Sequence, residues 1–109
     1  LTGMKIDIHR QTFAVANKTG GVSGPAIRPI AIRMVYEAAQ AVKVPLIGMG
    51  GITCGEDALE FILAGASAVS VGTANFYNPS ATIEVAEGIE AYMRQHKTEH
   101  FRDLIGLVY

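Results

Sequence analysis

The chain has 109 residues, of which half are hydrophobic and 17% are charged, with a formal net charge of −1. This composition excludes a disordered charged chain, and the balanced charge disfavours binding to nucleic acid or to an anionic membrane surface. The one cysteine, Cys54, cannot form an internal disulfide or a zinc site by itself, and no apolar run reaches membrane-spanning length, so we expect a cytoplasmic α/β protein without a metal.

The first third of the chain predicts a hairpin, a loop and a helix in that order. Residues 4–16 alternate apolar and polar side chains around a polar turn, which is typical of a β-hairpin. Asn17–Pro25 contains three glycines and no periodicity, and it predicts a loop near a ligand. From Pro29 onward apolar residues recur at helical spacing, so we expect a helix that ends before Val44 and buries Met34.

Two short apolar runs, Val44–Ile52 and Ala68–Thr73, each lead into small residues before a helix. A continuous apolar run is typical of a strand that is buried on both faces of a parallel sheet. Glycine at the end of such a strand lets backbone N–H groups approach an anion, and the next helix start adds positive partial charge. We therefore expect the turns at Gly50 and Gly72, which are 22 residues apart, to meet at one dianionic group.

The remaining helices are predicted from their end signals. Thr53 and Glu56 have the spacing of a capping box, which predicts a helix start, and Gly65 predicts the end of that helix. Phe61 falls in the apolar stripe between them and is expected in the core. A break at Asn78–Pro79 precedes a predicted helix over residues 81–95. A last short helix is expected to carry Phe101, Leu104, Ile105 and Val108.

The order of these elements is compatible with a (β/α)8 barrel or a doubly wound sheet, and glycine turns after the last two strands favour the barrel. Two strong parallel strands are too few for a complete sheet, and Leu1 falls within what reads as a strand end. We therefore predict one domain over residues 1–109: the C-terminal portion of a TIM (β/α)8 barrel with a β-hairpin insertion, and no second domain.

Three motifs together resemble the C-terminal part of class 1 dihydroorotate dehydrogenases: Thr19–Pro29, Ile47–Gly51 and Val71–Phe76. The resemblance runs from Gly3 to about Pro79 and is loose beyond it. The Gly-Gly-Val-Ser-Gly-Pro form of the first motif is more similar to the NAD-linked branch than to the fumarate-linked branch. The resemblance implies an FMN-dependent oxidation of (S)-dihydroorotate to orotate in de novo pyrimidine biosynthesis.

Carried over residue by residue, the resemblance implies that FMN is held by Gly24, Gly50, Gly51, Gly72 and Thr73. The catalytic base of the family, a cysteine or serine, is expected upstream of Leu1, so this segment alone is expected to be inactive. The implied partners are dihydroorotate and an electron-transfer subunit with FAD and an iron–sulfur cluster, which passes electrons to NAD. A homodimer within a heterotetramer is the implied assembly.

Three other interpretations remain open at this point. The chain could belong to a related FMN enzyme similar to dihydropyrimidine dehydrogenase, to a barrel that binds a phosphorylated metabolite without redox chemistry, or to an inactive structural fragment. Cys54 is expected to be an incidental thiol, and Ser23 is equally compatible with a flavin contact or a local turn. The three histidines are expected to be solvated: His9, His96 and His100.

Overall fold

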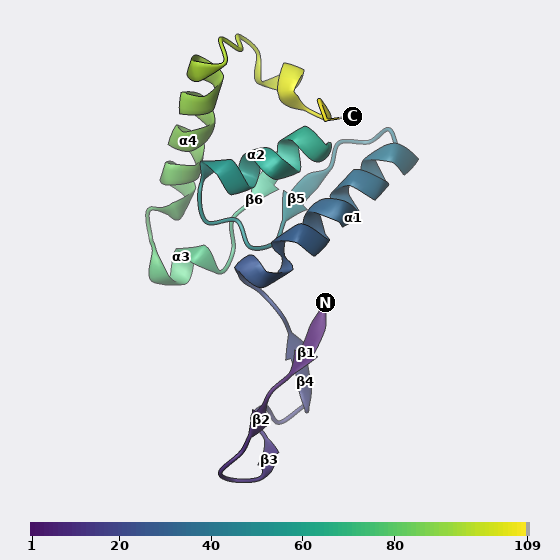
Figure 1. Cartoon of the computed structure of the whole chain (residues 1–109), viewed down its shortest axis with the longest axis vertical. Coiled ribbons are helices and arrows are strands. Elements are labelled where there is room, and N and C mark those ends of the chain that lie inside the picture. Colours follow the sequence, from purple (N-terminus) through teal and green to yellow (C-terminus); the bar gives the residue numbers. More distant parts are fainter. Residues whose placement is uncertain (109) are drawn as a thin grey trace.

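The protein consists of an α/β part and a narrow β arm that projects from it (Figure 1). The computed structural model describes residues 1–108. The arm makes the molecule elongated, with extents of 56 × 33 × 18 Å. In chain order the elements are β1 (Thr2–Met4), β2 (Ile6–Asp7), β3 (Thr12–Phe13), β4 (Thr19–Gly21), η1 (Pro25–Ile27), α1 (Arg28–Ala41), β5 (Ile47–Met49), α2 (Gly55–Ala64), β6 (Ala68–Ser70), α3 (Ala74–Tyr77), α4 (Ala81–Gln95) and η2 (Phe101–Leu104).

The arm is built from two antiparallel strand pairs. β2 pairs with β3 across the polar turn, with Ile6 opposite Phe13, so the predicted antiparallel hairpin pairing is confirmed. β1 pairs with β4, with Gly3 opposite Gly20, and the prediction of a loop is wrong for Thr19–Gly21. The pairing with β1 supplies the backbone partners of β4, and a glycine-rich sequence gives no local sign of such a partner.

The centre of the α/β part is a parallel pair, β5 and β6, in which Gly48 lies opposite Val69. The parallel pairing of these neighbouring strands was predicted and is confirmed. Helix α2 packs closely on this pair, because a Cβ at Gly48 would lie only 2.8 Å from the ring of Phe61. Phe61 is fully buried, as predicted, in a cluster with Ala31, Ile52, Ala58, Ala66 and Val85.

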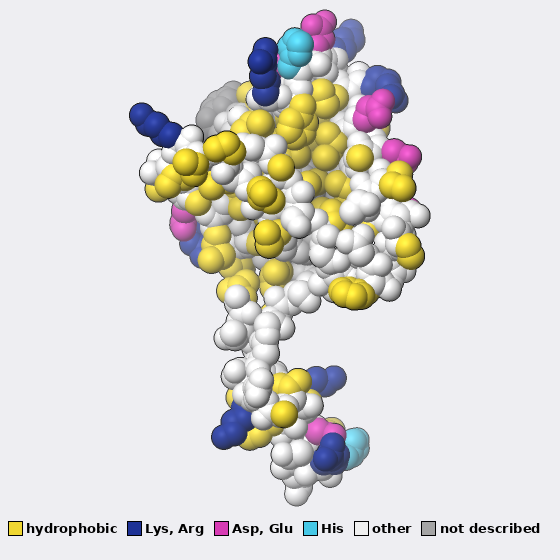
Figure 2. All heavy atoms as spheres, turned by 180° about the vertical axis from the view of Figure 1, so that it is seen from behind, with side chains coloured by type: hydrophobic (Ala, Val, Ile, Leu, Met, Phe, Trp, Pro, Cys, Tyr) yellow, Lys and Arg dark blue, Asp and Glu magenta, His cyan; other side chains and the backbone are white. Residues whose placement is uncertain are grey.

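The other face of the strand pair is open. Ile47 and Met49 of β5 are 64% and 60% exposed, so the prediction of strands buried on both faces is wrong for residues 1–108. Figure 2, which views the molecule from behind, shows many hydrophobic side chains at the surface of the α/β part. An apolar run predicts a surface that prefers burial, but it does not specify which segment covers that surface.

Helix α1 ends as predicted, at Ala41, where Val42 turns to an extended conformation. Pro29 occupies its first turn, where the missing N–H has no helical partner to lose. The prediction of a buried Met34 is wrong, because its side chain is 51% exposed. The apolar stripe of α1 is wider than the surface that α2 and β5 cover.

Helix α2 begins one residue later than the capping box predicts. Cys54 is the N-cap residue and makes no capping hydrogen bond, so the predicted pairing of Thr53 with Glu56 is wrong. Thr53 instead donates from its N–H and its hydroxyl to Asp57, at 2.9 and 2.8 Å. The end of α2 was predicted correctly, since Gly65 closes it with φ of 135°.

The C-terminal elements cover the outer side of α2. Helix α4 has the predicted bounds, whereas the short α3 was not predicted. The last predicted helix is a single 3-10 turn over Phe101–Leu104, and it leaves Ile105 and Val108 outside the helix. Leu104 packs with Leu59 and Ile62 in a second buried cluster.

The crossing of α2 and α4 has no room for a side chain between the helices. A Cβ at Gly55 of α2 would lie 2.5 Å from the Cα of Gly88, a backbone atom of α4. The two helices could accommodate the extra atom only by moving apart.

We expect Gly55→Ala to lower the free energy of unfolding by about 1 kcal/mol or more, although alanine favours helices. Urea denaturation of the natural full-length chain measures the change. Gly20→Ala is the matched control, because no atom lies within 4 Å of its added Cβ, and its effect should stay below about 0.5 kcal/mol. Equal effects of the two substitutions would contradict the tight crossing.

Candidate functional site

A small hollow forms where the carboxyl ends of β5 and β6 meet the segment that leads into α1. Its volume is about 230 Å³, and all five predicted cofactor-binding residues line it. They come from three separate segments of the chain. The full lining is Ser23, Gly24, Ile27, Met49, Gly50, Gly51, Ser70, Gly72 and Thr73.

The two glycines after β5 are required by the packing of the chain itself. A Cβ at Gly50 would lie 2.8 Å from the Cβ of Ala31 in α1. A Cβ at Gly51 would lie 2.5 Å from the carbonyl oxygen of Gly24 and 2.9 Å from the Cα of Pro25. Both glycines also have positive φ, 133° and 70°, which side chains disfavour. Their identity therefore follows from the fold, whether or not a ligand is bound.

Gly72 differs from these two glycines. Its φ lies outside the left-handed region, and a Cβ added to it would meet no atom of residues 1–108 within 4 Å. Nothing in the described chain therefore requires glycine at this position. A Cβ at Gly24 would also enter open space, but its φ of 93° already favours glycine. The absence of a side chain at Gly72 is thus best explained by a group outside residues 1–108 that approaches its backbone closely.

The hollow offers neutral hydrogen-bond donors rather than charges. Within residues 1–108 the backbone N–H groups of Gly50, Gly51, Gly72 and Thr73 donate to no other backbone or side-chain group. The lining contains no charged side chain. Successive free N–H groups in a glycine turn make a concavity that favours an anion, and the Thr73 hydroxyl adds a further donor. No residue of α2 lines the hollow, so the glycine turn rather than the first turn of α2 faces it.

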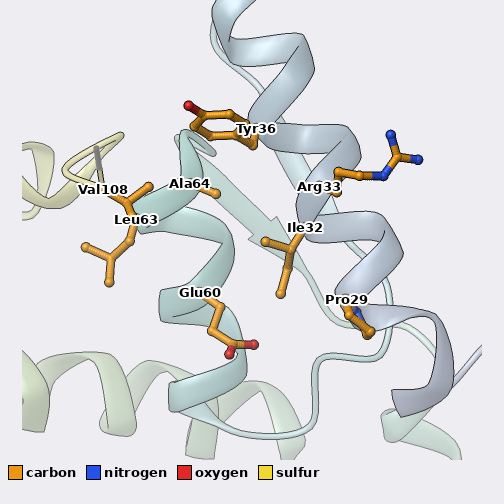
Figure 3. Close-up of a pocket in the computed structure, with 8 residues that line it drawn as sticks. All are labelled: Pro29, Ile32, Arg33, Tyr36, Glu60, Leu63, Ala64 and Val108. Carbon is orange, nitrogen blue, oxygen red and sulfur yellow. The ribbon is translucent and has the colours of Figure 1, made fainter.

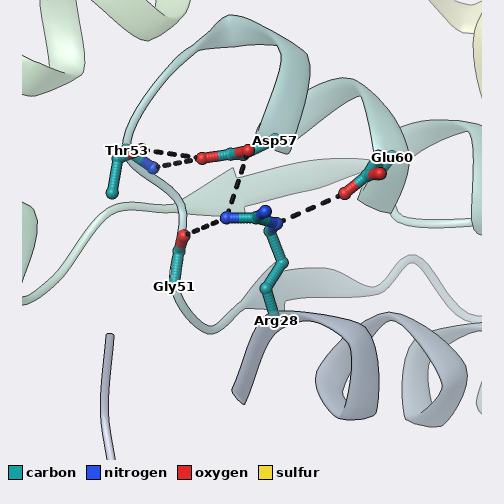
Figure 4. A network of polar contacts seen from close by, with 5 residues as sticks. All are labelled: Arg28, Gly51, Thr53, Asp57 and Glu60. Atoms are coloured by element: carbon teal, nitrogen blue, oxygen red, sulfur yellow. Dashed lines mark hydrogen bonds and ion pairs between the residues drawn. The ribbon is translucent and has the colours of Figure 1, made fainter. Parts of the chain in front are cut away.

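A polar network behind the hollow fixes the glycine turn (Figure 4). Arg28 Nη1 donates to the Gly51 carbonyl oxygen at 3.2 Å and lies 3.2 Å from Asp57 Oδ1. Its Nε lies 3.3 Å from Glu60 Oε2. One guanidinium at the start of α1 thereby contacts both the turn after β5 and helix α2.

Asp57 is the buried member of this network, with 8% of its surface exposed. Burial raises the pKa of its carboxyl. The hydrogen bonds from Thr53, the positive charge of Arg28 and a hydrogen bond from Cys54 all lower this pKa, and together they outweigh the effect of burial. The net result is a pKa below the ordinary value of 3.8. The ionised carboxylate is therefore the form that the folded chain stabilises.

Of the other candidate residues, only Ser23 lines the hollow within residues 1–108. Its hydroxyl makes no hydrogen bond to the described residues, and the remaining candidates lie outside the hollow. Cys54 is exposed and borders a different depression between α2 and α4. The three histidines are exposed, as expected. In the described part of the chain no three potential metal ligands cluster, and none of its helices could span a membrane.

A larger hollow lies elsewhere in residues 1–108. It has a volume of about 550 Å³ and lies between α1 and α2, with Val108 at its edge (Figure 3). It contains none of the predicted site residues. Its position between the helices, away from the carboxyl ends of the strands, separates it from the glycine turns.

Sequence reasoning missed Arg28 and Asp57. Arg28 lies within the first family-like motif but was given no role. The available signal was the spacing of Thr53 and Asp57, which places two hydrogen-bonding side chains one helical turn apart. Only the tertiary structure brings Arg28 to them.

We expect Asp57→Asn to destabilise the protein at about pH 7 and to lose this effect in acid. The pKa of Asp57 is depressed in the folded state, so its contribution is fully present above the ordinary carboxyl value of 3.8, shrinks as the pH falls below that value, and is lost as the pH falls through the lowered pKa of the folded state. Denaturation of the natural protein and the variant from about pH 7 to pH 3 measures the difference. Asp103→Asn, at an exposed position, is the control. A difference that stays constant down to pH 3 would contradict the role of the carboxylate.

The sequence is 67% identical to the dihydroorotate dehydrogenase B (NAD(+)) catalytic subunit of Lachnoclostridium phytofermentans over 99% of this chain and 36% of that protein. It is 61% identical to the subunit of the same name from Alkaliphilus metalliredigens over 97% of this chain and 35% of that protein. The chain thus spans about a third of the length of these curated relatives.

Among solved structures, the dihydroorotate dehydrogenase of Eimeria tenella in complex with ferulenol is similar, with a TM-score of 0.78 and 28% identity. That similarity covers 98% of this chain and 29% of the other. The arm and the α/β part together therefore have the fold of a segment of that enzyme. The sequence profile described as dihydroorotate dehydrogenase matches residues 1–93, and the chain belongs to the dihydroorotate dehydrogenase family.

Proposed function

We propose that this chain supplies the phosphate-binding part of an FMN site in an enzyme that oxidises (S)-dihydroorotate to orotate. The observation that carries the proposal is the common hollow of Gly24, Gly50, Gly51, Gly72 and Thr73. The names of the relatives, dihydroorotate dehydrogenase B catalytic subunits, support the reaction. The reaction would be a step of pyrimidine biosynthesis.

The residues of the hollow fit a phosphate group. Four backbone N–H groups without a partner in residues 1–108 and one hydroxyl border it, and a Cβ at Gly72 would enter open space. Neutral dipoles at fixed positions can bind a phosphate without a charged side chain. FMN would supply the two-electron chemistry, and these residues would hold and orient its phosphate end.

The position of the hollow fits a larger barrel. Met49 lines the hollow and lies on the open face of β5, so the hollow opens toward that face. We propose that β5 and β6 are strands of a (β/α)8 barrel, with the β arm as an insertion, and that other strands cover the open face. The catalytic base and the contacts to the flavin ring would come from those strands, since no ionisable side chain lines the described hollow.

Gly72→Val tests the phosphate site without disturbing the fold. The added side chain would enter the space proposed for the phosphate, so we expect the full-length variant to lose most of its bound FMN. In their flavin-free forms the variant and the natural full-length protein should have the same thermal stability, because bound FMN itself would stabilise the folded state. Flavin absorbance of the purified protein measures the loss. Gly20→Val is the matched control, because its added Cβ also meets nothing but lies outside the hollow.

Unchanged flavin content in Gly72→Val would contradict the site. Tight binding of a phosphorylated metabolite without flavin would favour the non-redox alternative. Turnover of dihydrouracil rather than dihydroorotate would favour the dihydropyrimidine dehydrogenase-like alternative.

The electron acceptor gives a separate prediction. We propose that electrons pass to NAD through a partner subunit that carries FAD and an iron–sulfur cluster, within a heterotetramer built on a homodimer of the catalytic subunit. The natural full-length protein alone is expected to reduce artificial acceptors with dihydroorotate but to reduce NAD slowly until the partner is added. Steady-state assays with and without the partner measure this. Fast NAD reduction by the isolated subunit would contradict the proposal.

Cys54→Ser serves as the control for these assays. Its thiol lies outside the hollow, and turnover of dihydroorotate is expected to change little. A loss of roughly a hundredfold, the scale of removing a general base, would identify Cys54 as catalytic and contradict this assignment.

A further inference from the structure

Arg28 connects two segments that line the hollow with helix α2, which does not line it. It begins α1, directly after the Gly24–Ile27 segment, and its guanidinium reaches the Gly51 carbonyl and the carboxylates of Asp57 and Glu60. Its side chain is 26% exposed, whereas that of Asp57 is 12% exposed. Two further arginine–glutamate pairs in residues 1–108, Arg33–Glu37 and Arg94–Glu90, are exposed pairs within single helices.

The contact with Gly51 fixes the orientation of one peptide unit in the proposed phosphate turn. The Gly51 carbonyl oxygen accepts from Arg28 Nη1 and is thereby turned toward α1 (Figure 4). Gly51 also lies against the Gly24 carbonyl and Pro25, so a movement of this turn would alter two segments of the lining together. Arg28 itself does not line the hollow.

We propose that Arg28 is a positioning residue, which holds the Gly24 and Gly51 segments in the geometry that binds the phosphate of FMN. This inference rests on the proposed function. Asp57 fixes the guanidinium, and Asp57 is itself held by the N–H and hydroxyl of Thr53. Within residues 1–108, no hydrogen bond or ion pair joins the wall formed by Gly72 and Thr73 to this network.

The chemistry of arginine is needed for this role. Nη1 contacts a carbonyl and a carboxylate while Nε contacts a second carboxylate, and the planar guanidinium presents these donors in fixed directions. Lysine would keep a positive charge beside Asp57 but has one flexible ammonium for three acceptors. Glutamine would leave Asp57 without its cation.

The test compares the binding of FMN and riboflavin to the flavin-free natural full-length protein and its variants, by quenching of flavin fluorescence. We expect Arg28→Gln to raise the Kd for FMN by about tenfold or more, the scale of losing a hydrogen bond with a charged partner. Arg28→Lys should have an intermediate effect. Riboflavin lacks the phosphate, so its Kd should change little in either variant.

Two controls separate positioning from general stability. Arg33→Gln removes an exposed arginine from the same helix and should leave both Kd values unchanged. Leu104→Ala removes buried contacts in the second cluster and should lower thermal stability without changing the preference for FMN over riboflavin. Arg28→Lys retains the cation and keeps the test available if Arg28→Gln does not fold.

Equal weakening of FMN and riboflavin by Arg28→Gln would overturn the proposal and leave Arg28 a purely structural residue. An unchanged Kd for FMN in both Arg28 variants would also overturn the proposal. If Gly72→Val abolishes FMN binding in the same experiment, the proposed phosphate site remains supported. If Gly72→Val also leaves FMN binding unchanged, the proposed function fails and the role of Arg28 fails with it.

Discussion

The close approach of Gly51 to the Gly24–Pro25 segment is the constraint on which the glycine-lined hollow depends. Two segments of backbone meet where a single Cβ would lie 2.5 Å from a carbonyl oxygen. The contact joins the turn after β5 to the chain that enters α1, and Arg28 fixes the same turn from behind. One wall of the hollow is therefore determined by direct packing and a charged hydrogen bond.

The opposite wall, Gly72 and Thr73, is positioned in another way. It follows β6, whose register with β5 sets its distance from the Gly50–Gly51 turn. No side chain of the polar network reaches it. The hollow thus combines a wall held by specific contacts with a wall held by sheet pairing. A substitution of Arg28 therefore tests the position of the Gly51 turn, whereas a substitution of Gly72 tests the open volume of the hollow.

The open face of β5 and β6 explains why much of the apolar surface remains exposed. Helices α1 and α2 cover one face of the strand pair, where Phe61 of α2 and Ala31 of α1 are buried in one cluster. The other face carries the exposed side chains of Ile47 and Met49. Since Met49 also lines the hollow, any segment that covers this face would adjoin the proposed phosphate site. The chain spans about a third of the length of its curated relatives, whose remaining length is sufficient for such a cover.

The sequence by itself determined the elements whose signals are local. The parallel strands, α4, the end of α1 at Ala41 and the end of α2 at Gly65 follow from apolar runs, helical periodicity and left-handed glycine. The five glycine and threonine residues of the hollow were named from the resemblance to dihydroorotate dehydrogenases, and strand ends followed by glycine independently indicated an anion site at Gly50 and Gly72. Only the tertiary structure decided the pairing of β1 with β4, the exposure of Met34 and the replacement of the Thr53–Glu56 capping box by Thr53 and Asp57. It also decided that Gly50 and Gly51 are required by packing while Gly72 is not, because the space around a glycine depends on residues far away in the chain.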